Sequence, residues 1–152
     1  MKRTEKRKGK RKMWITILII VGVIAIGATG GILADAPGRR EIKELTFSKV
    51  DFKNLRDGTY IGEYVGEKSH SRDTKVEVSI SGGKVSDVTI LKGALDKEGK
   101  PAELTGGKSI DDLFDNAVKS QSLQVDVISG ATITSKAHLK ALENALDKAQ
   151  SN

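Results

Sequence analysis

The longest apolar stretch of the chain runs from residue 13 to residue 34, 22 positions without a charged side chain. At about 1.5 Å per residue, a helix of that length crosses the ~30 Å hydrocarbon core of a bilayer. We therefore predict a transmembrane helix over residues 13–34. A cleavable signal peptide is the alternative, because Ala34-Asp35-Ala36 offers a small-x-small cleavage site. Pro37 directly after that site and the length of the apolar stretch favour an uncleaved anchor.

Further along the chain, the pattern changes to short alternating segments separated by turn residues. Residues 58–65 are rich in β-favouring side chains, and residues 75–80 and 84–90 each alternate polar with apolar positions. The Gly-Gly pair between the last two segments is a strong hairpin signal. We expect a three-stranded antiparallel sheet with one face exposed to water.

Helical periodicity follows in the last third of the chain. Residues 109–120 open with Ser109 as an N-cap and place acidic side chains in the first turn. A second helix opens near Thr134-Ser135 and carries an apolar stripe at spacings of three and four residues. Strands followed by helices predict an α+β domain with a small antiparallel sheet packed against two helices, over residues 57–150.

Two connecting segments have features of their own. Residues 92–108 form a glycine-containing loop that is long enough to act as a lid. Residues 123–128 form a short apolar stretch, which we expect to be a strand leading into the second helix. Residues 35–56 mix charged and apolar side chains without a sustained period, and we interpret them as a spacer.

The charge of the chain is concentrated at one end. Residues 1–12 carry eight Lys or Arg against one Glu, so the remaining residues are close to neutral although the whole chain carries +6. A basic tail directly before an apolar segment predicts a cytoplasmic N-terminus and an extracytoplasmic domain, with the tail in contact with anionic lipid headgroups. A near-neutral domain lacks the basic face that nucleic-acid binding needs.

Potential catalytic and metal-binding side chains are few. The chain contains no cysteine, which excludes disulfides, thiolate metal sites and a thiol nucleophile. His70 and His138 are the two histidines, and neither has neighbours spaced as metal ligands, so solvent exposure is the expectation for both. A Ser-His-Asp arrangement is not supported, because no nucleophile elbow is present.

The segment between the two predicted helices carries the candidate chemistry. Residues 126–135 read Asp-Val-Ile-Ser-Gly-Ala-Thr-Ile-Thr-Ser, a turn of small and hydroxyl-bearing residues that opens a helix. Backbone N–H groups at a helix start bind anions, and Gly130 and Ala131 let a bulky ligand approach the backbone. An ordinary helix cap is the alternative interpretation, since Ser and Thr are common before helices.

This segment resembles the FMN-binding domain family, which is related to the flavinylated subunits of sodium-pumping quinone reductases and Rnf-type electron-transfer complexes. The family pattern Asp-x-x-Ser/Thr-Gly-Ala-Thr is filled here by five residues, and the opening strand from Asp57 to Gly62 is also similar. The resemblance implies FMN attached to Thr132 through a phosphoester bond. The other implied site residues are Asp126, Ser129, Gly130 and Ala131, with Asp126 in transferase recognition, and Thr134 and Ser135 beside them.

The resemblance also implies partners and a role. Family members are modified outside the cytoplasm by an FAD:protein FMN transferase, and a membrane partner supplies electrons. We therefore expect a single-pass cell-membrane flavoprotein that relays electrons, an electron carrier more than an enzyme on its own. The alternatives are a non-covalent FMN-binding module and a cofactor-free envelope module. Residues 66–73 and 93–96 depart from the loops of the family pattern.

Overall fold

The computed structural model describes residues 16–20 and 35–150 of the chain. The chain divides into two units, residues 1–36 and residues 37–152. In the first unit, residues 16–20 are helical and expose their apolar side chains. The rest of the predicted transmembrane helix, and the basic tail before it, lie outside the described residues. Within the described parts, no helix combines the length and apolar character needed to span a bilayer.

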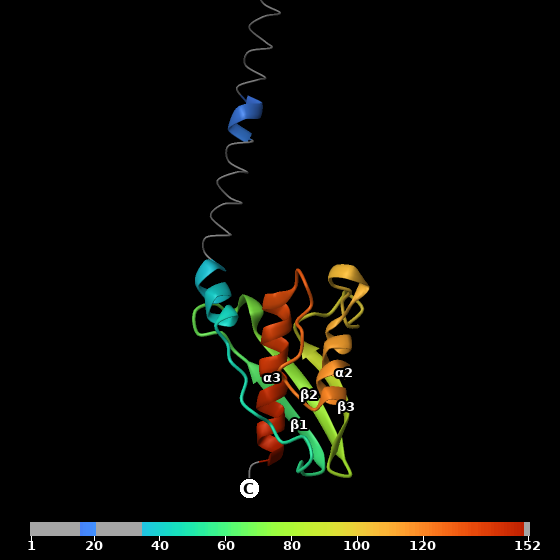
Figure 1. The fold of residues 1–152 in the computed structure, drawn as a ribbon. Helices are drawn as coiled ribbons and strands as arrows, with labels where there is room; N and C mark the ends of the chain where they lie inside the picture. The colour runs from blue at the N-terminus through green and yellow to red at the C-terminus, as the bar shows by residue number, and fades with distance from the viewer. Residues whose placement is uncertain (1–15, 21–34, 151–152) are drawn as a thin grey trace, which may run out of the picture. The chain divides into compact units, whose positions relative to one another are not determined.

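The second unit is built on a three-stranded antiparallel sheet (Figure 1). Its strands are β1 (Gly58–Tyr64), β2 (Thr74–Ser81) and β3 (Lys84–Lys92), in the order β1-β2-β3. Gly82 and Gly83 join β2 to β3 with φ angles of 61° and 74°, the positive values that a tight hairpin turn requires. The three predicted strands and the hairpin are confirmed.

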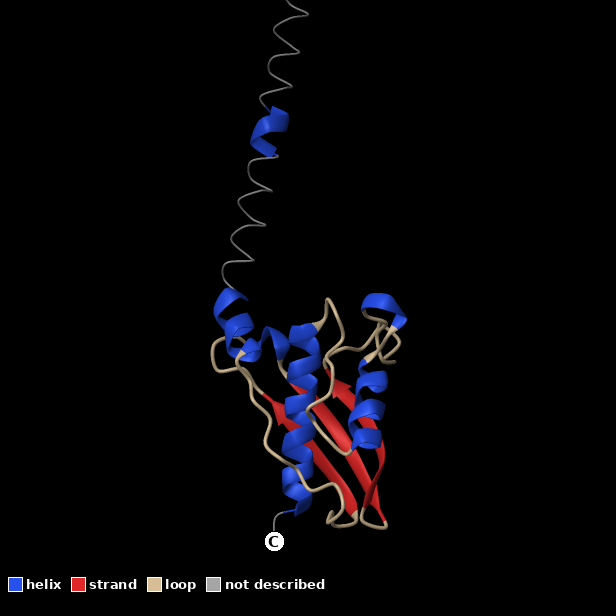
Figure 2. Ribbon diagram, in the orientation of Figure 1, coloured by secondary structure: helices blue, strands red, loops and turns tan. Residues whose placement is uncertain are grey.

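Two helices cover one face of this sheet (Figure 2). Helix α2 (Ile110–Ser120) packs against β3, and helix α3 (Thr132–Gln150) packs against β1 and β2. The β2 side chains facing the helices, Val76, Val78 and Ile80, are buried, while Lys75 and Glu63 form an ion pair of 2.8 Å between partly exposed side chains. The α+β prediction with one exposed sheet face is confirmed for this unit.

The start of α2 follows the sequence prediction closely. The Ser109 hydroxyl accepts a hydrogen bond from the Asp112 N–H, and the Asp112 carboxylate accepts one from the Ser109 N–H at 2.7 Å. This reciprocal capping satisfies two amide groups that the helix leaves without intrahelical partners. The helix ends at Ser120, and Gln121 follows in the left-handed conformation with φ 49°.

The predicted strand over residues 123–128 is wrong. These residues form no ladder with the sheet, yet Leu123 and Ile128 are buried. Figure 2 shows the connection between α2 and α3 in the helix layer, away from both edges of the sheet. Its apolar side chains therefore reach the core between the two helices, where no strand is available for pairing. Helix α3 also begins two residues earlier than predicted, at Thr132.

Residues 44–56, which we call the strap, are part of the predicted spacer and pack on the domain. Phe52 and Leu55 belong to the same buried core as the sheet and helices. Polar side chains of α3 bond the strap backbone: Lys136 Nζ to the Leu45 carbonyl (3.1 Å), Lys140 Nζ to the Thr46 carbonyl (3.2 Å), Glu143 Oε1 from the Ser48 N–H (2.6 Å) and Gln150 Nε2 to the Asp51 carbonyl (2.7 Å).

Burial of Glu143 shows how tightly the strap is held. Its side chain is 2% exposed, and its second carboxylate oxygen pairs with Lys140. A buried carboxylate is tolerated only when it is paired and hydrogen-bonded, so the strap backbone is part of what stabilises it.

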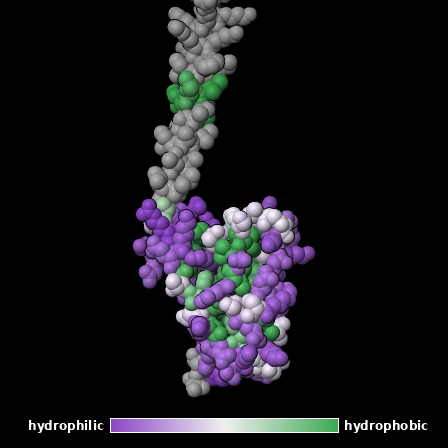
Figure 3. All heavy atoms as spheres, in the orientation of Figure 1, coloured by the Kyte–Doolittle hydropathy of each residue, from purple (hydrophilic) through white to green (hydrophobic). Residues whose placement is uncertain are grey.

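Figure 3 shows hydrophilic residues over most of the visible face of this unit, with a hydrophobic stretch along α3.

Helix α3 and strand β1 meet at an unusually short distance. A Cβ atom added to Gly62 lies 2.0 Å from the Ala141 carbonyl oxygen and 2.5 Å from the Ala145 backbone nitrogen. Two further contacts close the same edge of the sheet: Asn144 Oδ1 accepts from the Glu63 N–H at 3.1 Å, and Lys148 Nζ donates to the Ile61 carbonyl at 2.7 Å.

We predict that Gly62→Ala lowers the free energy of unfolding by about 3 kcal/mol or more, because backbone atoms cannot move aside for the new methyl group. Urea denaturation measures the change. Gly82→Ala is the control, since its Cβ meets nothing within 4 Å and only its φ of 61° costs energy, roughly 1 kcal/mol. Equal losses in the two variants would contradict the close contact.

Candidate functional site

The predicted site segment forms a tight turn that leads directly into α3. The Ala131 N–H donates to the Ile128 carbonyl at 2.9 Å, and Gly130 adopts a φ of 77° within this turn. Thr132 is the first residue of the helix, and the Ala131 carbonyl accepts the first helical hydrogen bond from Ser135 at 2.9 Å. Ala131 thus occupies the N-cap position, although its side chain has no acceptor for the first helical amides.

This arrangement bears on the two interpretations of the hydroxyl cluster. An ordinary cap places a Ser, Thr, Asp or Asn side chain at the N-cap position. Here that position is an alanine, and the hydroxyl of Thr132 lies one residue inside the helix. The N–H groups of the first turn have no carbonyl partners within the helix, and they lie at the same helix end as Thr132. The local geometry therefore fits an external anion better than a self-capped helix.

Ser135 holds the turn against the helix from the inside. Its side chain is fully buried, and its Oγ accepts a hydrogen bond from the Ile128 N–H at 3.2 Å. The bond joins the residue before the turn to the first turn of α3. It also satisfies a backbone amide that is buried away from water.

The predicted site residues are near in sequence and differ in exposure. Asp126, Ser129 and Gly130 are exposed, whereas Ala131, Thr132 and Thr134 are partly buried. Asp126 lies in a groove of about 650 Å³ between α2 and the connection that follows it. Thr134 lies in a different cavity, on the sheet side of α3. The segment therefore brings the hydroxyls to the helix start and leaves Asp126 apart from them.

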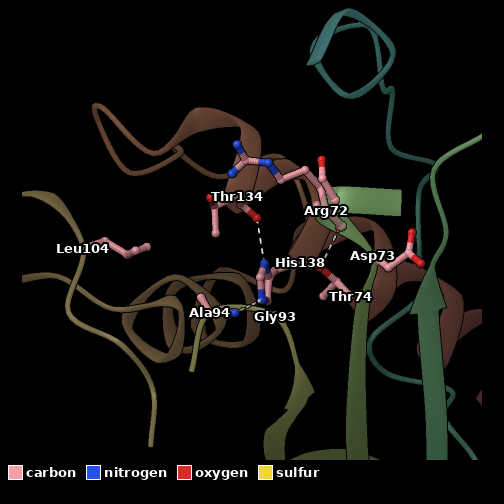
Figure 4. Close-up of a pocket in the computed structure, with 10 residues that line it drawn as sticks. Arg72, Asp73, Thr74, Gly93, Ala94, Leu104, Thr134 and His138 are labelled. Atoms are coloured by element: carbon pink, nitrogen blue, oxygen red, sulfur yellow. Dashed lines mark hydrogen bonds between the residues drawn. The ribbon is translucent and has the colours of Figure 1, made fainter. Parts of the chain in front are cut away.

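The cavity at Thr134 has a volume of about 230 Å³ and is formed by three segments far apart in sequence. Residues 71–74 form the end of the β1–β2 connection and the start of β2, and Gly93 and Ala94 follow β3. Thr134, Ala137 and His138 come from the first two turns of α3. Figure 4 shows Arg72, Thr134 and His138 around this space. The two loops that depart from the family pattern both contribute to its wall.

His138 is the residue of this cavity that the sequence interpretation missed. The prediction of solvent exposure is wrong for His138, which is 2% exposed, and holds for His70 in the 3₁₀ helix η1 (His70–Arg72). Ala94 donates its N–H to His138 Nε2 at 3.2 Å, so Nε2 carries no proton. The other ring nitrogen, Nδ1, therefore bears the proton and donates to the Thr134 carbonyl at 2.8 Å.

The protonation state of His138 follows from the same surroundings. Burial lowers the pKa of the imidazole below its usual value, because the charged form is poorly solvated there. The bond to the Thr134 carbonyl acts in the opposite direction and does not offset burial. A Cβ atom on Gly93, whose φ is 132°, falls 2.4 Å from Nε2, so only glycine allows the chain to pass this close to the ring.

The loop between β1 and β2 is ordered by two carboxylates. Glu41 accepts from the Glu67 N–H (3.0 Å), the Tyr64 hydroxyl (2.8 Å) and the Lys68 N–H (3.0 Å), and these bonds lower the pKa of Glu41. Burial acts to raise the pKa of Asp73, but the hydrogen bond from the Gly66 N–H and the nearby His70 and Lys92 hold it below its usual value.

The segment after β3 reaches the turn that precedes Thr132. A bridge between Leu95 and Pro101 closes its first part, and a 3₁₀ helix, η2 (Thr105–Gly107), forms its end. A Cβ atom on Gly130 falls 2.8 Å from the Thr105 hydroxyl oxygen, which places Thr105 directly against the turn. The predicted lid therefore lies along the site from His138 to Gly130.

We predict that Ser135→Ala lowers the free energy of unfolding by about 1–3 kcal/mol, because the buried Ile128 N–H loses its acceptor. Ser129→Ala is the matched control: its side chain is exposed, so we expect a change within about 0.5 kcal/mol. Chemical denaturation of both variants gives the comparison. A loss at Ser135 no larger than that at Ser129 contradicts the assigned role of the Ser135 hydroxyl.

Comparison with known proteins covers the part of the chain that contains the turn into α3. The model of the FMN-binding domain matches residues 70–147, from η1 through most of α3. An NADH:acrylate oxidoreductase of Vibrio harveyi is 29% identical over 120 residues, which are 78% of this chain and 11% of that protein. The chain therefore corresponds to a small part of a much longer relative. With its family model spanning half of the sequence and the turn into α3, the chain belongs to the FMN-binding domain family.

Proposed function

We propose that this protein is a membrane-anchored electron carrier whose FMN is attached to the Thr132 hydroxyl through a phosphoester bond. FMN is the cofactor of the family to which the chain belongs. The observation that carries the proposal is the position of Thr132 as the first residue of a 19-residue helix whose N-cap residue is an alanine. The Thr132 hydroxyl and the first helical amides are thereby offered to the same ligand.

The residues around Thr132 fit a flavin phosphate. The positive end of α3 favours an anion, and the turn before it is exposed at Ser129 and Gly130. The cavity at Thr134 begins one half-turn of helix further on and contains both apolar side chains and the charged Arg72. Its volume of about 230 Å³ lies below the ~300–1,000 Å³ usual for pockets that enclose a ligand, so the cavity would enclose only part of FMN.

The attachment chemistry must come from another protein. A threonine hydroxyl is a weak nucleophile unless a base activates it. His138 cannot serve as that base, because Nε2 and Nδ1 are both engaged, with Ala94 and Thr134. The ring of His70 is hydrogen-bonded to Asp73, the residue that follows η1. We therefore infer that an FAD:protein FMN transferase supplies the base and that Thr132 is its substrate, with Asp126 as the recognition residue.

The bound flavin supplies the redox chemistry, and the protein supplies position and electrostatics. Arg72 lines the cavity, and its positive charge would favour an anionic group held there. The correspondence with a small part of a longer oxidoreductase supports the role of an electron-carrying module that works with other domains or proteins. A membrane-bound donor suits a domain that follows an apolar 22-residue segment.

We predict that the full chain, secreted together with a flavin transferase, gains the mass of FMN less one water. Thr132→Val removes the gain, because no hydroxyl remains to form the phosphoester. Thr59→Val is the control, since Thr59 is an exposed position on β1. Intact-mass spectrometry gives the answer. A wild-type protein that stays unmodified while a known substrate is fully flavinylated contradicts covalent attachment and favours a non-covalent or cofactor-free module.

The proposed topology is testable because the chain contains no cysteine. Lys97→Cys places a single thiol on an exposed loop position of the domain, and Lys8→Cys places one in the basic tail. We predict that a membrane-impermeant maleimide labels Lys97→Cys on intact cells and labels Lys8→Cys only after lysis. Labelling of both variants on intact cells, or of neither, contradicts a cytoplasmic tail with an external domain.

A further inference from the structure

His138 joins α3 to the segment that follows β3. Its ring accepts the Ala94 N–H through Nε2 at 3.2 Å and donates from Nδ1 to the Thr134 carbonyl at 2.8 Å (Figure 4). Thr134 lies two residues after the proposed attachment residue. Ala94 opens the segment that ends against Gly130. The imidazole therefore ties that segment to the helix end that carries Thr132.

Residues 93–108, which we call the wall loop, are linked by their own backbone hydrogen bonds. The Ala102 N–H donates to the Ala94 carbonyl at 2.9 Å, the Asp96 N–H to the Lys100 carbonyl at 2.8 Å, and the Leu104 N–H to the Lys108 carbonyl at 2.7 Å. A displacement at Ala94 is thus passed to Ala102 directly. Leu104 lines the same cavity as His138, and the neighbouring Thr105 rests on the turn before Thr132.

The hydrogen bond from the Ala94 N–H is the main polar contact between His138 and the wall loop. Arg72 and Asp73 share the cavity with it from the segment between β1 and β2, and Asp73 is engaged with Gly66, His70 and Lys92. From α2, the Phe114 ring lies with its centroid 6.3 Å from that of His138. The single carboxylate lining the cavity is therefore already committed to other partners.

We propose that His138 is a positioning residue for the flavin site: the neutral ring holds the wall loop against α3, and its protonation releases the loop. This inference rests on the proposed function, because it assigns the wall loop as one side of the space that FMN occupies. A proton taken from water binds to Nε2. The new N–H group then faces the Ala94 N–H, and two donors cannot bond each other.

The direction of the pH effect follows from burial. In the closed state, with the wall loop bonded to His138, burial holds the pKa of the ring below its ordinary value. Release of the loop (the open state) removes this effect, so opening is coupled to the binding of a proton. The contribution of His138 to the stability of the closed state is complete above about pH 6.5, the ordinary pKa of histidine. It is lost as the pH falls below that value. Carboxylates such as Glu41 and Asp73 have lowered pKa values and therefore lose their contributions at more acid pH.

Amide hydrogen exchange of the full chain without flavin tests the tie itself. We expect the protection factor of the Ala94 amide, corrected for intrinsic exchange, to fall about tenfold between roughly pH 7 and pH 5.5. Amides of β2 should keep their protection over this range, which separates loop release from global unfolding. Unchanged protection at Ala94 overturns the proposal, and this result requires no variant.

Two substitutions separate the titration of His138 from its size. His138→Gln keeps an acceptor near the position of Nε2 and cannot be protonated there, so Ala94 should stay protected at both pH values. His138→Phe retains a ring without an acceptor, so protection should be low at both. A pH dependence that survives in His138→Gln assigns the effect to another group and overturns the proposal.

A second measurement on flavin-loaded protein tests the link to the cofactor. Iodide quenching of the flavin fluorescence should increase over the same pH range in the wild type and stay constant in His138→Gln. Loop release without any change in quenching shows that the wall loop does not shield the flavin, and it overturns the inference while leaving attachment at Thr132 intact. Failure to load flavin contradicts the proposed attachment alone, because the exchange experiment on flavin-free protein is unaffected.

Discussion

The contact between α3 and β1 at Gly62 is the constraint on which the rest of the domain depends. With no side chain at Gly62, the strand backbone lies against Ala141 and Ala145 of the helix. That contact fixes how α3 sits along the edge of the sheet. Helix α3 contains the proposed attachment residue at its first position and the buried His138 in its second turn. It also provides the polar side chains that bind the strap. A shift of the helix therefore moves all of them together.

The polar groups buried along α3 are organised by backbone partners more than by other side chains. Ser135 accepts from Ile128, His138 bonds Thr134 and Ala94, and Glu143 accepts from Ser48. Each bond satisfies a group that is costly to leave unpaired away from water. The bonds to Ile128, Ala94 and Ser48 also tie the turn before Thr132, the wall loop and the strap to the helix. These three segments thus have defined positions although none of them belongs to the sheet or to an α-helix.

The sequence predicted the parts of the fold that depend on local patterns. Alternation and the Gly-Gly pair gave the three strands, and Ser109 with its acidic neighbours gave the start of α2, because these signals act within a few residues. The strap and His138 depend on contacts between residues more than 40 positions apart in the chain. The strap is bound by α3 through its backbone, which every sequence shares, and its apolar side chains follow no regular period, so the sequence did not predict its packing. Residues 123–128 have the apolar composition of a strand, but their path between two helices leaves them no strand to pair with.

The same distinction applies to the candidate site. The motif around Thr132 was found from a short run of residues, and the structure places that residue at the start of α3. The surrounding cavity was not found, since it combines residues 71–74, the segment after β3 and the first two turns of α3. A glycine such as Gly93 looks like an ordinary loop residue in the sequence. Its requirement becomes clear only from the 2.4 Å between its missing Cβ and His138.

The central claim is that FMN is bonded to Thr132, and peptide mapping tests it most directly. Trypsin cuts after Lys119 and Lys136, so residues 120–136 leave the protein as one peptide. From denatured, flavinylated protein we expect this peptide alone to absorb as a flavin, with fragmentation placing the mass of FMN less one water on Thr132. A flavin-free peptide, or a modification placed on Ser129, Thr134 or Ser135, contradicts the account.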